Sequence, residues 1–280
     1  ELPAIFEQSA IALAVYEAGY TVALMGETLK TDGEKLYQKA KKVPFSGGQL
    51  VDYLFSDIAA NLRKKVEYVI RDGFSQGQTN QQIINRIKGR KSLDYKDGLL
   101  QSERYVIERQ VRTARSHVSN TSYLQTYEAL GFTHIKFVSV LDGRSSFTCA
   151  NLDQTMWKID DPKIRRPPLH PNCRSTLIGV DADGNLGGVR PFVADERKIK
   201  NIPKDERDGI IGQVEANTKF SDWFKDQDDD FQRNWLGSTR FELYKKSDFP
   251  IDKFVDPIGR KYTLDELKAL DKKTFKELGL

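Results

Sequence analysis

The sequence predicts an α+β protein that is predominantly helical, with a small central β-sheet that holds a proline-rich loop. Two observations carry this prediction. Apolar residues recur every three or four positions over most of the chain, as they do on the buried face of a helix. Two short central segments are instead rich in β-branched and aromatic residues, with a period of two that is typical of strands.

The composition is that of an ordinary soluble protein that can bury a core. The chain has 280 residues, of which 39% are hydrophobic and 30% charged, with a formal net charge of +4. This surplus permits contact with nucleic acid but does not indicate it, because the basic residues are spread along the chain. Two cysteines exclude a disulfide-dense secreted scaffold and fit a reducing cytosol. No secretory signal peptide is expected.

The first region, residues 1–98, is predicted to be helical. An apolar-rich helix runs to about Glu27, and a polar helix follows over residues 32–42. Within the first helix, the apolar run of residues 10–25 contains Glu17 and is shorter than the roughly 20 residues that a membrane span needs. We therefore expect no membrane span, and this run is a candidate for docking onto a partner. Packing inside its own domain is the alternative.

After a break at residues 44–48, where proline and glycine interrupt the pattern, a second apolar stripe predicts a helix. The stripe consists of Leu50, Leu54, Ile58, Leu62, Val66 and Ile70. Thr79 and Gln82 have the spacing of a capping box, which predicts the start of a short helix. Residues 88–98 are polar and predict a mobile loop.

The second region, residues 99–180, switches from helix to strand. Ser102 is predicted to cap a long helix that ends near Gly131, since glycine suits the left-handed residue that closes many helices. Residues 133–141 predict a strand and residues 175–180 a second one. The first strand has Ile135, Phe137, Ser139 and Leu141 on one face. The third region, residues 181–280, is predicted to be a helical extension interrupted by prolines.

The segment between the two predicted strands holds both cysteines and one of the three histidines. His170 and Cys173 form an H-x-x-C pair on a loop with three prolines, and a rigid loop suits a structural metal site. Cys149, His170 and Cys173, with Asp142 as a candidate fourth ligand, would make a zinc set. Two alternatives stay open. The cysteines are small buried apolar residues and His170 a hydrogen-bonded anchor, or the cysteines form a disulfide, which requires Cα atoms within about 7 Å.

Residues 142–174 resemble the phage Mu protein F-like domain found in minor head proteins. The closing block, residues 167–174 (PPLHPNCR), matches that family's pattern almost letter for letter. The earlier blocks are matched by Asp142, Arg144, Cys149, Leu152, Asp153 and Trp157, and an upstream helix motif by Arg112, Thr113 and Asn120. Further blocks between residues 222 and 279 resemble the C-terminal part of the same proteins, so the resemblance covers about residues 50–280.

Two departures from the family pattern bear on the metal hypothesis. Ser146 and Ser175 stand where many relatives carry cysteine, and a serine hydroxyl is a far poorer soft-metal ligand than a thiolate. We therefore expect no cofactor and a structural loop. In it, Asp142 and Arg144 pair with each other or with Arg112 and Arg174, while His170 and Asn172 fix the turn by hydrogen bonds to buried backbone groups. The expected structural residues are Arg112, Asn120, Asp142, Arg144, Cys149, His170, Asn172, Cys173 and Arg174.

The resemblance implies a minor head, or head-morphogenesis, protein of a tailed bacteriophage. Such a protein would assemble in the host cytoplasm and lie inside the capsid near the portal, with the portal protein and other capsid components as partners. It would assist assembly and genome packaging or ejection.

Two other function classes stay open. The first is an enzyme, a nuclease or nucleotide transferase, with His170 or Asp142 as base. However, the sequence offers no convincing nucleophile, P-loop or H-E-x-x-H motif, so no catalytic residue is predicted. The second is an internal virion protein that binds packaged double-stranded DNA without sequence preference, through its modest positive charge.

Overall fold

The computed structural model describes residues 2–45, 48–247 and 249–280, and the chain forms two compact units. Unit 1 comprises Glu1–Leu130 and Arg166–Cys173, and unit 2 comprises Gly131–Arg165 and Arg174–Leu280. The predicted class is confirmed, because 55% of the chain is helical and the strands form two small three-stranded sheets. Among the described residues, no helix has the length and apolar character needed to cross a membrane.

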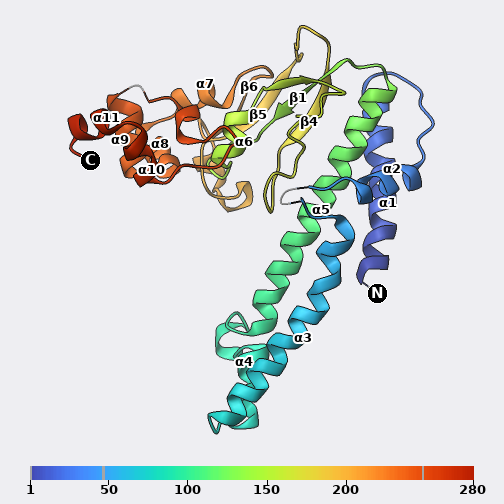
Figure 1. Ribbon diagram of the computed structural model, residues 1–280, viewed down its shortest axis with the longest axis vertical. Helices are drawn as coiled ribbons and strands as arrows, with labels where there is room; N and C mark the ends of the chain where they lie inside the picture. The colour runs from blue at the N-terminus through green and yellow to red at the C-terminus, as the bar shows by residue number, and fades with distance from the viewer. Residues whose placement is uncertain (1, 46–47, 248) are drawn as a thin grey trace. The chain divides into compact units, whose positions relative to one another are not determined.

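Unit 1 is built from helices (Figure 1). They are α1 (Leu2–Leu24), α2 (Gly33–Lys42), α3 (Val51–Ser75), α4 (Asn80–Lys88) and α5 (Leu99–Ala129), with a 3₁₀ turn, η2, at Lys91–Leu93. The long helices α3 and α5 lie side by side as a hairpin, with α4 at the end of α3 that is far from α1 and α2. At the predicted break of residues 44–48, Phe45 and Gln49 form an isolated antiparallel β-bridge. Residues 46 and 47 of the break lie outside the described chain.

The core of unit 1 is formed where α1 and α2 pack on α5. It is made largely of small side chains that are almost completely buried: Ala10, Ala14 and Ala18 of α1, Ala40 of α2, and Ala114 and Val118 of α5. Glu17 directs its carboxylate toward α5, where Tyr123 Oη donates to it at 2.5 Å and Ser119 Oγ at 3.2 Å. One face of the apolar run 10–25 is therefore packed inside unit 1, where the Glu17 carboxylate is hydrogen-bonded to α5.

Side-chain caps begin α2 and α4 in unit 1, whereas α3 and α5 begin without one. The Thr79–Gln82 capping box is present at the start of α4, as predicted. The prediction for α5 is wrong at its start, because the helix begins at Leu99 and the Ser102 hydroxyl donates to the Leu99 carbonyl inside it. Gly98 precedes the helix because a Cβ there would lie 2.3 Å from the Gly89 nitrogen.

The segment between α4 and α5, predicted as a mobile loop, has its own structure. It contains the 3₁₀ turn η2, and Arg90 Nε lies 2.7 Å from Asp97 Oδ2. At the other end of α5, Gly131 takes a φ of +82°, which agrees with the predicted left-handed residue.

Unit 2 contains both sheets. In the first, β1 (His134–Val138) lies between β3 (Met156–Lys158) and β4 (Thr176–Val180) and is antiparallel to both. In the second, β5 (Val189–Val193) is parallel to β2 (Leu141–Asp142) and antiparallel to β6 (Ile211–Glu215). Ile135 stands opposite Trp157 on one side and Gly179 on the other.

The predicted strand of residues 133–141 is divided between the two sheets. Its predicted inner face is confirmed, since Ile135, Phe137, Ser139 and Leu141 are all buried. The strand is interrupted after Val138 because the Ser139 N–H donates to the Asp153 carboxylate at 2.7 Å. Leu141 and Asp142 then pair with β5.

Residues 181–219, predicted as part of a helical extension, instead hold strands β5 and β6 and two 3₁₀ turns, η3 (Ile199–Asn201) and η4 (Lys204–Glu206). Pro191 obscured the first of these strands in the sequence. β5 accommodates Pro191 because β2 pairs only with Phe192 and Val193. On that side of β5, no strand residue lies opposite Pro191 to accept the N–H that proline lacks.

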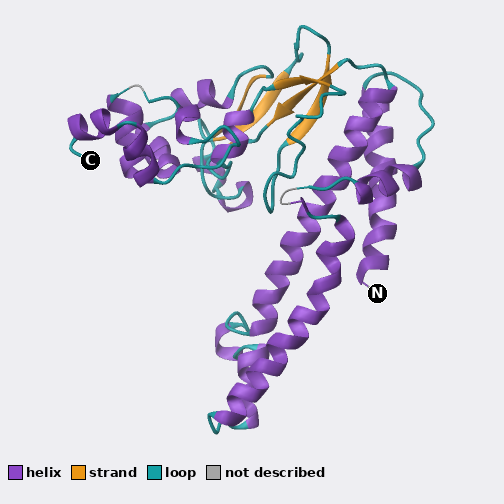
Figure 2. Cartoon of the chain, viewed as in Figure 1, coloured by secondary structure: helices purple, strands orange, loops and turns teal. Residues whose placement is uncertain are grey.

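The remainder of unit 2 is helical, as predicted (Figure 2). Its helices are α6 (Phe147–Leu152), α7 (Phe220–Lys225), α8 (Asp229–Leu236), α9 (Ser238–Lys246), α10 (Leu264–Leu270) and α11 (Lys272–Leu278), with a 3₁₀ turn, η5, at Ile251–Phe254. They enclose an aromatic core, in which Phe220, Phe224 and Phe254 are fully buried and Phe147 stacks on Trp235 at 4.1 Å.

The two units do not follow the predicted region boundaries at residues 98 and 180. The long helix α5 lies in unit 1, because it carries the contacts of α1 and α2. Residues 181–280 lie in the same unit as the central strands, because β5 pairs with β2 and the aromatic core includes Leu141 and Phe147.

Candidate functional site

Asp142, at the end of β2, is the charged centre of the signature segment. Its side chain is only 1% exposed. Arg174 binds it with two nitrogens, Nη1 at 2.6 Å from Oδ2 and Nη2 at 2.8 Å from Oδ1, and Arg144 Nη2 lies 3.0 Å from Oδ2. The predicted pairing of Asp142 with Arg144 and Arg174 is therefore present, in the bidentate form that gives the strongest ion pairs.

The Asp142 carboxylate also organises the turn that follows it. The Arg144 N–H donates to Oδ1 at 3.0 Å, and the Ser145 hydroxyl lies 3.2 Å from the same oxygen. Burial alone would raise the pKa of Asp142, but the Arg174 and Arg144 guanidinium groups outweigh burial and hold that pKa below its ordinary value. Because both oxygens are bound and the proton affinity is low, Asp142 is poorly suited to act as a general base.

A second ion pair, Asp153 with Arg190, lies deeper in unit 2. The two side chains are 0% and 8% exposed, and Arg190 Nη1 lies 2.9 Å from Asp153 Oδ2. Arg190 also donates to the carbonyls of Thr218 and Ser139. Asp153 accepts from the N–H groups of Ser139 and Phe220, at 2.7 and 2.8 Å. The pair thus has the additional hydrogen bonds that a buried ion pair requires.

In unit 1, Asn172 is fixed to the long helix α5 through its backbone. The Asn172 N–H donates to Thr113 Oγ1 at 3.1 Å, and Thr113 Oγ1 donates to the Arg109 carbonyl at 2.7 Å. Asn172 has a φ of +59°, a conformation in which asparagine is better tolerated than most residues. Thr113, which belongs to the upstream motif, therefore joins this loop to the helix.

His170 and Cys173 are carried by one tight turn of the same loop. The Cys173 N–H donates to the His170 carbonyl at 3.1 Å, and Cys173 is buried. His170 Nδ1 lies 3.0 Å from the Pro171 carbonyl, in an exposed contact. The predicted fixing of the turn by His170 and Asn172 through buried backbone groups stays a prediction. In the structure, His170 Nδ1 contacts the Pro171 carbonyl and the Asn172 N–H donates to Thr113 Oγ1.

The other expected motif residues are distributed over both units. In unit 1, Arg112 pairs with Glu108 at 3.4 Å, and buried Asn120 donates to the Ser116 carbonyl at 2.8 Å. In unit 2, Cys149 is buried in α6, and its N–H donates to Ser146 Oγ at 3.2 Å. Ser146 therefore caps α6.

Sequence reasoning missed His117, a buried histidine of α5. Its Nε2 lies 2.9 Å from the Ala40 carbonyl, and its ring lies 4.9 Å from that of Phe45. Burial lowers the pKa of His117, so the ring is neutral at pH 7. No local pattern marks this residue, because its partners lie more than seventy positions away along the chain. Its contacts join α5 to α2 and identify it as part of the core.

Comparison with known families decides what this arrangement belongs to. Residues 64–178 match the family model described as "Phage Mu protein F like protein". These residues belong to the Mu F-like family. The Mu F-like segment extends from within α3 to β4 and includes Thr113, Asp142, Asp153 and the whole proline-rich loop. No curated protein and no solved structure matches the chain.

The expectation that the loop binds no zinc stays a prediction, because Cys149 lies in unit 2 whereas His170 and Cys173 lie in unit 1. The two cysteines do not form the alternative disulfide in the structure. Asp142 is not suited to be the fourth zinc ligand, since Arg174 and Arg144 occupy its oxygens. We expect purified protein to contain no stoichiometric zinc when elemental analysis follows dialysis without chelator. One equivalent of zinc in the natural chain that is lost in Cys173→Ser would contradict the structural interpretation of the loop.

The low pKa of Asp142 makes its contribution to stability pH-dependent. A carboxyl whose pKa is lower in the folded than in the unfolded state stabilises the fold above its unfolded pKa of about 4, and loses that effect as pH falls through the folded pKa. Asp142→Asn is therefore expected to lower the free energy of unfolding by about 3–5 kcal/mol at pH 7, because two arginines lose their partner.

Urea unfolding of both proteins at pH 7 and below pH 4 measures this effect. The difference in free energy of unfolding between the natural chain and Asp142→Asn should be smaller below pH 4 than at pH 7. The exposed ion pair of Lys273 with Glu277 offers a control, since Lys273→Ala should cost only about 0–1 kcal/mol. An equal difference in unfolding free energy at both pH values would show that the charge of Asp142 does not stabilise the loop.

Proposed function

We propose that the chain is a minor head, or head-morphogenesis, protein of a tailed bacteriophage that lies inside the capsid near the portal. The observation that carries this proposal is the match of residues 64–178 to the Mu F-like family, which supports a phage protein of head morphogenesis. The portal protein and other capsid components are the proposed partners. Contact with packaged DNA and release with the genome remain predictions from net charge and resemblance.

The geometry of the signature segment supports a structural role. Asp142 and Asp153, its two buried carboxylates, are bound by Arg174, Arg144 and Arg190. Thr113 and Asn172 join the loop to α5 within unit 1. These two carboxylates are thus engaged in holding unit 2 together, which favours an assembly protein over an enzyme.

The outer face of α1 is the proposed docking surface for the portal protein. Ile5, Tyr16, Tyr20 and Leu24 are 64%, 65%, 53% and 65% exposed, and the two tyrosine rings stack at 6.1 Å. None of the exposed residues between positions 4 and 24 is charged. Aromatic enrichment and charge depletion are typical of the centre of a protein interface. Packing inside unit 1 accounts for one face of the run 10–25, and docking is proposed for the other face.

Substitution on this face tests the docking role without disturbing the core. We expect Tyr16→Glu combined with Tyr20→Glu to reduce co-assembly with the portal protein by at least about tenfold, because two charges would be placed in an apolar interface. Co-purification from cells that express both proteins, followed by quantitative mass spectrometry, measures this. Thermal unfolding should be unchanged, since both rings are exposed.

Tyr68→Glu combined with Tyr105→Glu is the matched control, because these tyrosines are equally exposed on α3 and α5. Undiminished co-assembly of the α1 variant would contradict the docking role. Electron density for the chain at the tail fibres or on the outer shell of an assembled particle would contradict the proposed function as a whole.

A further inference from the structure

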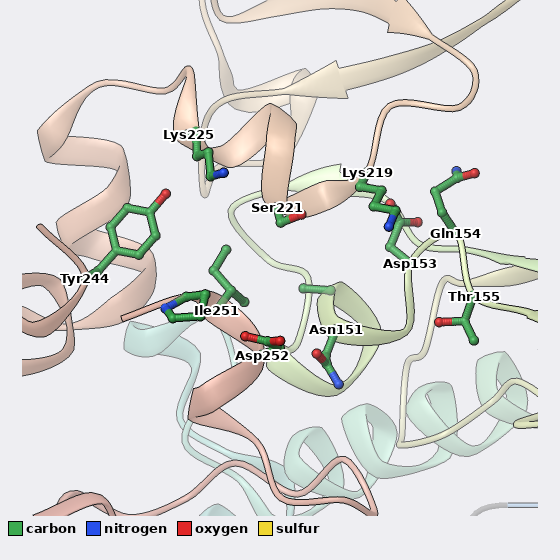
Figure 3. Close-up of a pocket in the computed structure, with 12 residues that line it drawn as sticks. Asn151, Asp153, Gln154, Thr155, Lys219, Ser221, Lys225, Tyr244, Ile251 and Asp252 are labelled. Atoms are coloured by element: carbon green, nitrogen blue, oxygen red, sulfur yellow. The ribbon is translucent and has the colours of Figure 1, made fainter. Parts of the chain in front are cut away.

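Unit 2 contains a pocket that is lined in part by residues 150–155 of the signature segment. It has a volume of about 330 Å³ and lies between the end of α6, the start of α7, α9 and η5 (Figure 3). Its lining residues are Ala150, Asn151, Asp153, Gln154, Thr155, Lys219, Ser221, Lys225, Tyr244, Pro250, Ile251 and Asp252. A volume of this size is in the range of pockets that hold small organic ligands.

The pocket presents polar side chains that have no partner within the described chain. Among the described residues, no side-chain hydrogen bond or ion pair involves Asn151, Lys219, Ser221, Lys225 or Asp252. Elsewhere in unit 2 the buried carboxylates of Asp142 and Asp153 are bound by arginines. Lys219, Lys225 and Asp252 are instead exposed, so their charged groups are open to a ligand that enters the pocket.

The charges in the pocket are arranged by sign. Lys219, which precedes α7, and Lys225, which ends it, lie along one side with Ser221 between them (Figure 3). Asp153 does not neutralise these lysines, because Arg190 already binds its carboxylate. The remaining carboxylate, Asp252, lies with Asn151 on the opposite side (Figure 3).

This arrangement selects a ligand with two different ends. Ammonium groups act as point charges that suit phosphate, and a hydroxyl such as that of Ser221 can donate to a phosphate oxygen. A carboxylate and an amide instead accept from the hydroxyl groups of a polyol. Ile251 and the Tyr244 ring supply an apolar wall between the two sides. We propose that the pocket binds a small phosphomonoester, with its phosphate between Lys219 and Lys225 and its hydroxyl groups toward Asp252 and Asn151.

Isothermal titration calorimetry on the full chain tests this, with ribose 5-phosphate, adenosine monophosphate, ribose and inorganic phosphate as probes. We expect at least one of the two phosphomonoesters to bind more tightly than inorganic phosphate, and ribose to bind more weakly than ribose 5-phosphate. Lys219→Gln combined with Lys225→Gln should lower the affinity for the phosphomonoester by at least about tenfold, because charge-assisted hydrogen bonds are lost. Both lysines are exposed, so the variant should fold normally.

Two further variants separate the sides of the pocket. Lys272→Gln combined with Lys276→Gln removes the same charge from exposed positions of α11 and should leave affinity unchanged. Asp252→Asn should lower the affinity for ribose 5-phosphate but not for inorganic phosphate, because only ribose 5-phosphate presents hydroxyl groups to the Asp252 side of the pocket.

Two results would overturn the proposal: no binding by either phosphomonoester, or an equal loss of affinity in the α11 control. A 5′-phosphorylated oligonucleotide is titrated as a fifth probe, and binding by it alone would assign the pocket to DNA ends instead of a small molecule.

Discussion

The fold of unit 2 depends on one buried ion pair, Asp153 with Arg190. A charge removed from water is costly unless it is paired and hydrogen-bonded, so a buried pair ties together every segment that completes it. Here those segments are the chain leaving β1 at Ser139, the end of α6, strand β5, and the start of α7 at Phe220. The pair therefore connects the first sheet, the second sheet and the helical part of the same unit.

The signature of the Mu F-like family follows from the same constraint. Asp142 repeats the arrangement nearby, with Arg174 and Arg144 as partners, and Thr113 holds the proline-rich loop on α5 in unit 1. Such residues are fixed by the contacts that they complete. The surfaces proposed to recognise other molecules are the uncharged face of α1 and the pocket beside α7.

The sequence predicted those features that depend on neighbours in the chain or on a family motif. The capping box at Thr79, the glycine after α5 and the pairing of Asp142 with nearby arginines belong to this group. Features that depend on distant partners were missed. Arg190 lies on β5, which was not predicted as a strand because it contains Pro191. His117 of α5 contacts Ala40 of α2, so neither residue leaves a local pattern in the sequence. The start of α5 was misplaced because close packing of Gly98 on Gly89, and not a side-chain cap, sets it.

A double-mutant cycle on Asp153 and Arg190 tests the central role of this pair most directly. Urea unfolding would be measured for the natural chain, Asp153→Ala, Arg190→Ala and the double variant. We expect each single variant to lose about 3–5 kcal/mol, because it leaves a buried charge without a partner, and the double variant to lose less than the sum by about 1–3 kcal/mol. Losses that add within about 0.5 kcal/mol would contradict a fold that depends on this pair.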